Sequence, residues 1–159
     1  MTNSQPKITI REATTADRDF ILSLVPRFAD FGPPLWRSPQ QIIDRTIRSI
    51  EEGLARLVDR FLIAEVGGQP QGFIRLIASV DYFDDKPVGY IADVAVAATA
   101  EGQGIGRALM SAAEQWAESH HLGLLELHVF ANNWRSIEFY EKLGYQAEVV
   151  KYVKLLPKG

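Results

Sequence analysis

The chain has 159 residues, 47% of them hydrophobic and 23% charged. These fractions are typical of globular proteins and exclude a disordered, collagen-like or fibrous chain. The net charge of −3 argues against a nucleic-acid partner, because nucleic-acid-binding proteins usually carry a basic face. With no cysteine, disulfides, thiolate metal sites and thiol nucleophiles are excluded, and we expect no metal.

The length is that of one ordinary domain, so we expect residues 1–159 to form a single domain. The opening residues lack the apolar core of a secretory signal. No stretch approaches the ~18 apolar residues that a membrane span needs. We therefore expect a soluble, cytoplasmic protein with no membrane partner.

The predicted elements begin with a strand over residues 7–11 and a helix that follows Thr14 or Thr15 and continues to about Phe28. A second helix is predicted from Ser38, a capping residue followed by proline, to about residue 54. Three strands follow, with a turn at two consecutive glycines between the first two and a loop before the third; they cover residues 61–66, 72–79 and 89–96.

The second half of the chain predicts alternating helices and strands. They are a helix over 104–121, a strand over 124–130, a helix over 133–143 and a last strand over 145–156. The resulting order is β-α-α-β-β-β-α-β-α-β, with hairpins first and helical crossovers later. This order predicts an α/β fold (α+β by some definitions) with a mixed, mostly antiparallel sheet and helices on both faces.

Three alternating glycines between a strand and a helix form the most informative segment. Gly102, Gly104 and Gly106 directly follow the strand and open the helix, an arrangement that suits phosphate binding. A ligand-free turn would need only one glycine. In a dinucleotide-binding motif the third glycine would fall at Arg107, and no P-loop Gly-Lys-Ser/Thr is present. A pyrophosphate cradle of another type is therefore favoured.

Two motifs together resemble the GNAT superfamily of acetyl-CoA-dependent N-acetyltransferases. The segment from Glu101 to Gly106 matches the family's Arg/Gln-x-x-Gly-x-Gly/Ala except at its first position. The segment from Asn133 to Tyr145 is similar to the second motif, Asn-x-x-Ala/Ser-x-x-x-Tyr-x-x-x-Gly-Phe/Tyr. The resemblance covers about residues 89–145.

The resemblance implies transfer of an acetyl group from acetyl-CoA to a primary amine by direct attack, with Tyr140 protonating the leaving thiolate. A phenol, whose ordinary pKa is near 10, is protonated at neutral pH and can donate. Without the motif, Tyr140 would be interpreted as a core residue. The implied cofactor-binding residues are Val94, Ala95 and Val96 for the pantetheine arm, Gly102, Gln103, Gly104, Ile105, Gly106 and Arg107 for the pyrophosphate, and Asn133 and Ser136 on the last helix.

Two positions depart from the family pattern. Glu101 replaces the usual Arg or Gln, and its repulsion of a pyrophosphate, ~1 kcal/mol at an exposed site, should weaken cofactor binding. Ala92 stands where many relatives carry a glutamate that acts as base, and strand alternation predicts that Asp93 faces the opposite side. Candidate bases are therefore Glu126, His128 and Glu65, or a chain of water; the alternative for each is a solvent-facing polar residue.

The acceptor pocket is expected to use aromatic residues near the first two helices and acidic residues before the fourth strand, which together would suit a cationic amine. These residues are Phe28, Phe31, Pro33, Pro34, Leu35, Trp36, Asp81, Tyr82, Phe83, Asp84 and Asp85. The acceptor is a small molecule or a protein amino group, and a homodimer is a further expectation. Two alternatives stay open: a non-catalytic acyl-CoA-binding or interaction module on the same fold, and a nucleotide-binding regulator that uses only the glycine turn.

Overall fold

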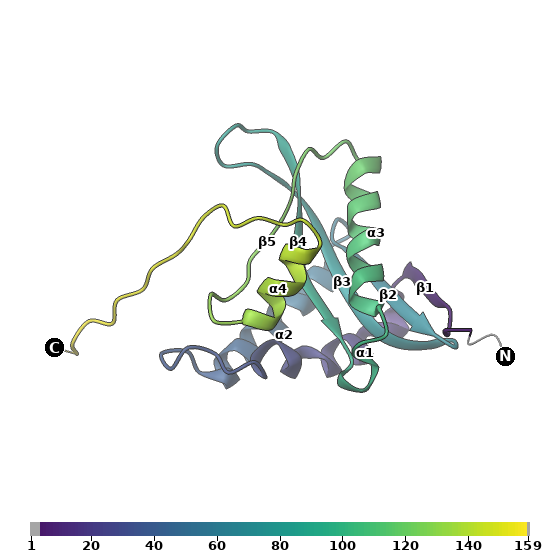
Figure 1. Cartoon of the computed structure of the whole chain (residues 1–159), viewed down its shortest axis with the longest axis horizontal. Coiled ribbons are helices and arrows are strands. Elements are labelled where there is room, and N and C mark those ends of the chain that lie inside the picture. The colour runs from purple at the N-terminus through teal and green to yellow at the C-terminus, as the bar shows by residue number, and fades with distance from the viewer. Residues whose placement is uncertain (1–3, 159) are drawn as a thin grey trace.

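The computed structural model describes residues 4–158, which form one five-stranded sheet and four α-helices. Figure 1 shows the strands side by side in chain order, β1-β2-β3-β4-β5. The first four pair antiparallel and β5 runs parallel to β4, so the predicted mixed, mostly antiparallel sheet is confirmed. The strands are β1 (Ile8–Glu12), β2 (Arg60–Val66), β3 (Gln69–Val80), β4 (Pro87–Val96) and β5 (Leu125–Leu127).

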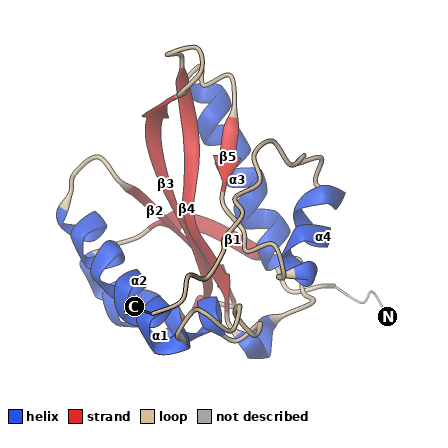
Figure 2. Cartoon of the chain, turned by 90° about the vertical axis from the view of Figure 1, so that its left-hand side faces the viewer, coloured by secondary structure: helices blue, strands red, loops and turns tan. Residues whose placement is uncertain are grey.

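The helices cover both faces of the sheet, as predicted. Figure 2 shows α1 (Arg18–Ser23) and α2 (Pro39–Ala55) on one side, and α3 (Ile105–Ser119) and α4 (Trp134–Lys142) on the other. Each face has its own buried apolar cluster. The sheet is therefore the middle layer of a three-layer arrangement.

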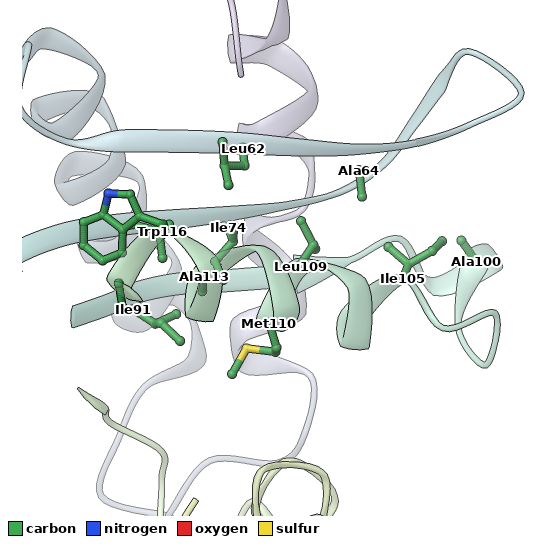
Figure 3. Packing of buried hydrophobic residues seen from close by; sticks show 12 residues of the cluster. Leu62, Ala64, Ile74, Ile91, Ala100, Ile105, Leu109, Met110, Ala113 and Trp116 are labelled. Atoms are coloured by element: carbon green, nitrogen blue, oxygen red, sulfur yellow. The ribbon is translucent and has the colours of Figure 1, made fainter. Parts of the chain in front are cut away.

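The residues of α3 that pack on the sheet recur at the expected helical spacing. Ile105, Leu109 and Ala113 are at most 1% exposed, and Trp116 is 8% exposed. Figure 3 shows these side chains directed at Leu62 and other residues of the strands. The packing fixes the N-terminus of α3 at the end of β4.

The first predicted helix is divided into three short pieces, contrary to the prediction of one continuous helix. A 3₁₀ helix, η1 (Thr15–Asp17), precedes α1, and a second, η2 (Val25–Ala29), follows it. Thr14 and Asp17 cap η1 reciprocally. Pro26 lacks the N–H that a continuing helix would use, so the chain re-forms as η2.

A β-bulge at Ala92 opens the sheet. Arg75 of β3 is opposite Asp93, but the next residue of β3 is opposite Ile91, so Ala92 is an extra residue in β4. Pairing of β4 with β5 covers only three residue pairs and ends at Ile91. A bulge bends its strand and strengthens the local twist, which separates β4 from the continuation of β5. The predicted strand over 124–130 is accordingly shortened to β5.

The last predicted strand, over 145–156, is absent from the described structure. Residues 146–158 are exposed and contain no strand, turn or bend. Figure 1 shows this segment in yellow, leaving α4 and extending away from the other elements. Its composition suits a strand, but a strand also needs a hydrogen-bonded neighbour, and within residues 4–158 it has none. We call residues 146–156 the C-terminal arm.

Within residues 4–158, no helix is both long enough and apolar enough to cross a bilayer.

Candidate active site

An open cleft of about 940 Å³ lies where β4 and the chain after β5 separate. The glycine turn, the first turns of α3 and α4, and η2 complete its walls. Of the twelve predicted site residues, only Gln103 is not part of the lining. The residues brought together are Val94, Ala95, Val96, Gly102, Gly104, Ile105, Gly106, Arg107, Asn133, Ser136 and Tyr140.

The glycine turn leaves a set of free backbone amides at one end of the cleft. Gly102 and Gly104 have φ values of +77° and +82°, and Gly104 caps α3. The first helical hydrogen bond runs from the Ala108 amide to the Gly104 carbonyl, 3.0 Å, so the amides before Ala108 have no helical acceptor. Together with the positive end of the α3 dipole, these amides can bind an anion.

Gly106 has a different role from the other two glycines. A Cβ at this position would lie 3.3 Å from Cζ of Phe139, which is tighter than ordinary contact. The small residue therefore lets α3 and α4 approach closely beside the cleft. It couples the glycine turn to the helix that carries Tyr140.

Glu101 is paired with two arginines, which changes the expectation that it simply repels a phosphate. Its carboxylate accepts hydrogen bonds from Arg27 of η2 and from Arg135 of α4, the latter at 3.0 Å. All three residues line the cleft. The negative charge is thus compensated locally, and it holds two cations at the edge of the glycine turn.

Arg27 is a site residue that the sequence reasoning missed. Besides Glu101, it donates to the carbonyl of Val96 at 3.2 Å and to Asp30 at 2.5 Å. It therefore connects η2, the end of β4 and the glycine turn. Because Arg27 occupies the Val96 carbonyl, Val94 is left as the residue of this segment whose backbone N–H and C=O both face the open edge of β4.

Tyr140 lies on the α4 wall together with Ser136 and Asn133. Burial raises the pKa of Tyr140 above its usual value, so the phenol stays protonated well into the alkaline range. The ring also packs beside the apolar cluster under α3 and lies 6.0 Å from the ring of Tyr145. Asn133 has a structural role as well: its Oδ1 accepts the Ser136 amide at 3.4 Å and caps α4.

The three candidate bases are not equivalent. His128 lines the cleft, and its Nδ1 lies 3.1 Å from the hydroxyl of Tyr90. Glu126 lies beside this pair, opposite Tyr90 in the sheet register, and its charge helps burial to raise the pKa of Tyr90. Glu65 is bonded to Arg11 across β1 and β2 and does not line the cleft.

The bulge at Ala92 interrupts the alternation on which the expected direction of Asp93 rested. Asp93 lines the cleft and accepts a hydrogen bond from Arg75 at 3.2 Å. Burial raises the pKa of Asp93, and the positive charge of Arg75 opposes that rise. Arg75 also donates to Asp59 at 2.8 Å and to Ser49 at 3.0 Å. Asp93 is therefore held in a buried ion-pair network.

The acceptor end of the cleft differs in part from the prediction. Phe28 and Phe31 line it together with Asp30, and the ring of Phe31 lies 5.3 Å from that of Phe130. The loop between β3 and β4 is not part of the lining. Asp81 in that loop is buried and accepts the amides of Phe83 and Asp84, so it stabilises its own turn. Pro33, Pro34, Leu35 and Trp36 also lie outside the lining.

Metal-binding clusters are not found in the described part of the chain, where no three His, Asp or Glu residues are grouped suitably. The cleft instead combines backbone amides, arginines and a half-buried phenol. The amides and arginines suit a phosphate-bearing ligand.

The cleft thus lies between a strand that opens at a bulge, a glycine turn into a helix and a tyrosine on the next helix. Residues 26–145 match the model of the Acetyltransferase (GNAT) family. The chain belongs to this family, which confirms the resemblance drawn from the two motifs.

Two curated archaeal relatives are similar in sequence to part of the chain. An uncharacterized N-acetyltransferase of Methanocaldococcus jannaschii is 35% identical over 95 residues, which are 58% of this chain and 42% of that protein. Another uncharacterized N-acetyltransferase, of Archaeoglobus fulgidus, is 33% identical over 88 residues, 55% and 60% of the two chains. The matched region thus spans less than two thirds of either relative.

Solved structures share the fold over nearly the whole chain. A putative acetyl transferase from Pyrococcus furiosus superposes with a TM-score of 0.78 at 24% identity, covering 94% of this chain and all of that one. The aminoglycoside N-acetyltransferase AAC(6')-Iy, solved with CoA, gives 0.72 at 19% identity, covering 97% and 99%. At these identities the likeness establishes the fold alone.

Proposed function

We propose that this protein transfers the acetyl group of acetyl-CoA to a primary amine, with Tyr140 as the general acid. The observation that carries the proposal is the cleft that opens at the Ala92 bulge. It has free backbone amides at one end and a half-buried phenol, whose pKa burial raises, on its wall. Membership of the GNAT family supports the same activity.

The residues of the cleft fit acetyl-CoA along its length. Amides of the glycine turn suit the pyrophosphate, with Arg107 and Arg135 adding positive charge. The edge of β4 beyond its pairing with β5 offers the backbone groups of Val94 and the amide of Val96 to the pantetheine arm. Ser136 and Asn133 face the same cleft from α4. When bound, acetyl-CoA supplies an activated thioester.

Two proton transfers are required of the protein. A primary amine resembles lysine, with an ordinary pKa of about 10.4, so it must lose a proton before it attacks. The departing sulfur must gain one, and we assign this donation to Tyr140, because it lines the cleft and its raised pKa keeps the phenol protonated. Among the candidate bases we favour His128, because it lines the cleft and is oriented by Tyr90.

The experiment that tests the activity measures release of free thiol from acetyl-CoA on addition of a panel of primary amines. CoA and ADP binding are titrated calorimetrically alongside. Thiol release that depends on an amine supports the transferase. Tight CoA binding without release would instead identify a non-catalytic acyl-CoA-binding module, and equal affinity for CoA and ADP would identify a nucleotide-binding regulator.

Substitution of Gly104 by valine should weaken CoA binding by at least tenfold. A β-branched residue at φ +82° strains the turn that aims the free amides, and the strain alone costs about 1 kcal/mol or more. Calorimetric titration of CoA measures the effect. Gly68→Val is the matched control, since Gly68 has φ +75°, open space around it and a position in the β2–β3 turn. Equal CoA affinity in the two variants would locate the phosphate elsewhere.

Removal of the Glu101 carboxylate should affect CoA binding more strongly when Arg135, one of its two arginine partners, is absent. In the Arg135→Ala background, Glu101→Gln should tighten CoA binding up to about fivefold, because the carboxylate then keeps Arg27 as its one arginine partner and its repulsion of the phosphates costs up to ~1 kcal/mol. In the wild-type background the change should be within twofold, because Gln also releases Arg135. A double-mutant cycle of CoA affinities at low salt measures the coupling, which should shrink as salt is added. Additive effects would show that Arg135 does not screen Glu101.

A further inference from the structure

The acceptor end of the cleft has apolar walls from separate segments of the chain. Phe28 of η2, Phe31 just after η2 and Ile42 of α2 line it, and so does Phe130, which follows β5. Phe28 is held in place because its ring meets the ring of the fully buried Phe73 edge-on, with centroids 6.4 Å apart. This end of the cleft therefore suits the apolar part of a ligand.

Two contacts join these walls. The ring of Phe31 lies 5.3 Å from that of Phe130, and Nδ2 of Asn132 donates to the carbonyl of Gly32 at 2.9 Å. The contacts tie the loop after η2 to the chain after β5. They bound the space at the acceptor end, which therefore admits a small molecule more readily than a segment of polypeptide.

Two of the three acidic residues in the lining are already occupied by arginines. The three are Asp30, Asp93 and Glu101. Arg27 donates to both Asp30 and Glu101, and Arg135 also donates to Glu101. Asp30 and Glu101 therefore have no uncompensated charge to attract a cationic ligand.

Asp93 is the acidic residue whose charge is only partly compensated. It shares the guanidinium of Arg75 with Asp59, so two carboxylates contact one cation. Of the two, Asp59 does not line the cleft and its side chain is 1% exposed, whereas Asp93 lines it. Arg75 also donates to Ser49, which lies about one helical turn after Thr46, a residue of the cleft lining. The cleft thus has one excess negative charge, next to the α2 wall.

We propose that the acceptor is a small amine with one positive charge on an apolar body. The inference rests on the proposed acetyl transfer and narrows its substrate class. The ammonium lies toward Asp93 until it loses its proton, and the hydrocarbon or aromatic body lies among Phe28, Phe31 and Phe130. A second ammonium on the same molecule would leave water among these rings with no carboxylate to receive it, which weakens binding. Polyamines and amino sugars with several ammonium groups are therefore poor acceptors.

A matched series of amines tests the charge and the body separately. Thiol release from acetyl-CoA gives kcat/KM for hexylamine, ethylamine and 1,6-diaminohexane under the same conditions. We expect hexylamine to exceed ethylamine by about tenfold or more, because the added methylenes are taken out of water. Hexylamine should exceed 1,6-diaminohexane, which has the same carbon chain and a second ammonium, by a similar factor. A diamine used as well as hexylamine, or an ethylamine used as well, would overturn the proposal.

A variant that adds a carboxylate to the apolar wall should change this preference. Phe31→Glu should raise the ratio of kcat/KM for the diamine to that for hexylamine by about fivefold or more, because the second ammonium then has a partner. Phe83→Glu is the matched control, since Phe83 is 71% exposed and outside the lining. Both substrates are measured on one sample, so the ratio does not depend on the folded fraction. An unchanged ratio in Phe31→Glu would place the body of the amine elsewhere.

Binding separates failure of this inference from failure of the proposed function. If no amine releases thiol, the acetyl transfer is wrong, and calorimetric titration of the same amines into the CoA-saturated protein still tests the site. Tighter binding of hexylamine than of ethylamine and of the diamine would support it. Tighter binding of the diamine, or no binding of hexylamine, would overturn it.

Discussion

Replacing Tyr140 by phenylalanine is expected to lower kcat by about 10²- to 10⁴-fold, the usual contribution of a positioned acid or base. The ring and its packing beside Tyr145 are kept, so only the proton donor is lost. Affinity for acetyl-CoA should change little. Steady-state kinetics with a saturating amine, together with calorimetry, measure the two quantities separately.

Varying the thiol that the acyl donor releases tests the role of Tyr140 as proton donor more directly. An acyl donor whose thiol has a lower pKa needs less protonation as it departs, so the loss caused by Tyr140→Phe should shrink with such a donor. Because burial raises the pKa of Tyr140, the wild-type enzyme should keep its acid function through pH 9. Phe139→Leu, next to Tyr140 on α4, is the packing control. Near wild-type turnover of a stable Tyr140→Phe protein with both donors would make Tyr140 a core residue only.

Replacing Arg75 by methionine is expected to lower the free energy of unfolding by about 3–5 kcal/mol, the usual cost of removing one partner of a buried ion pair. The side chains of Arg75 and Asp59 are 4% and 1% exposed, and that of Asp93 is 11% exposed. Without the guanidinium, two carboxylates are left in the interior with no cation. Urea unfolding followed by circular dichroism measures the loss.

Arg60→Met is the matched control for this substitution. Arg60 lies on β2 and is also paired with a carboxylate, that of Glu12, but the two side chains are 41% and 57% exposed. Exposed pairs of this kind contribute about 0–1 kcal/mol. If Arg75→Met destabilises the protein no more than Arg60→Met, the network is not required for stability.

The position of Arg75 also explains why a glycine, Gly53, stands within α2. It lies within α2, where glycine costs about 1 kcal/mol relative to alanine. A Cβ at this position would lie 2.7 Å from the Arg75 guanidinium. The close approach of Arg75 to the helix backbone therefore explains a residue that helix propensity alone disfavours.

Features encoded in neighbouring residues were predictable from the sequence. The glycine turn, the sheet-facing side of α3 and the α4 positions of Asn133, Ser136 and Tyr140 all follow local patterns. The structure brings the glycine turn and the α4 positions together in one cleft. The family was identified from the same segments.

Features that depend on distant pairings could not be predicted. Arg27 and Glu101 are 74 positions apart, and no local pattern relates them. The bulge at Ala92 arises from a register shift between β3 and β4, which alternation within one strand does not reveal. The C-terminal arm shows the converse: its residues favour a strand, but within residues 4–158 it has no hydrogen-bonded neighbour that would complete one.

The bulge at Ala92 also separates two properties that are usually coupled, the existence of a binding cleft and its selectivity. The cleft exists because one strand contains one residue more than its neighbour can pair, a feature of backbone register that does not depend on the lining side chains. Phe28, Asp30, Phe31 and Phe130 can therefore be exchanged to accept a different amine while the opening persists. By contrast, we expect deletion of Ala92 to let β4 pair further along β5 and so narrow the opening.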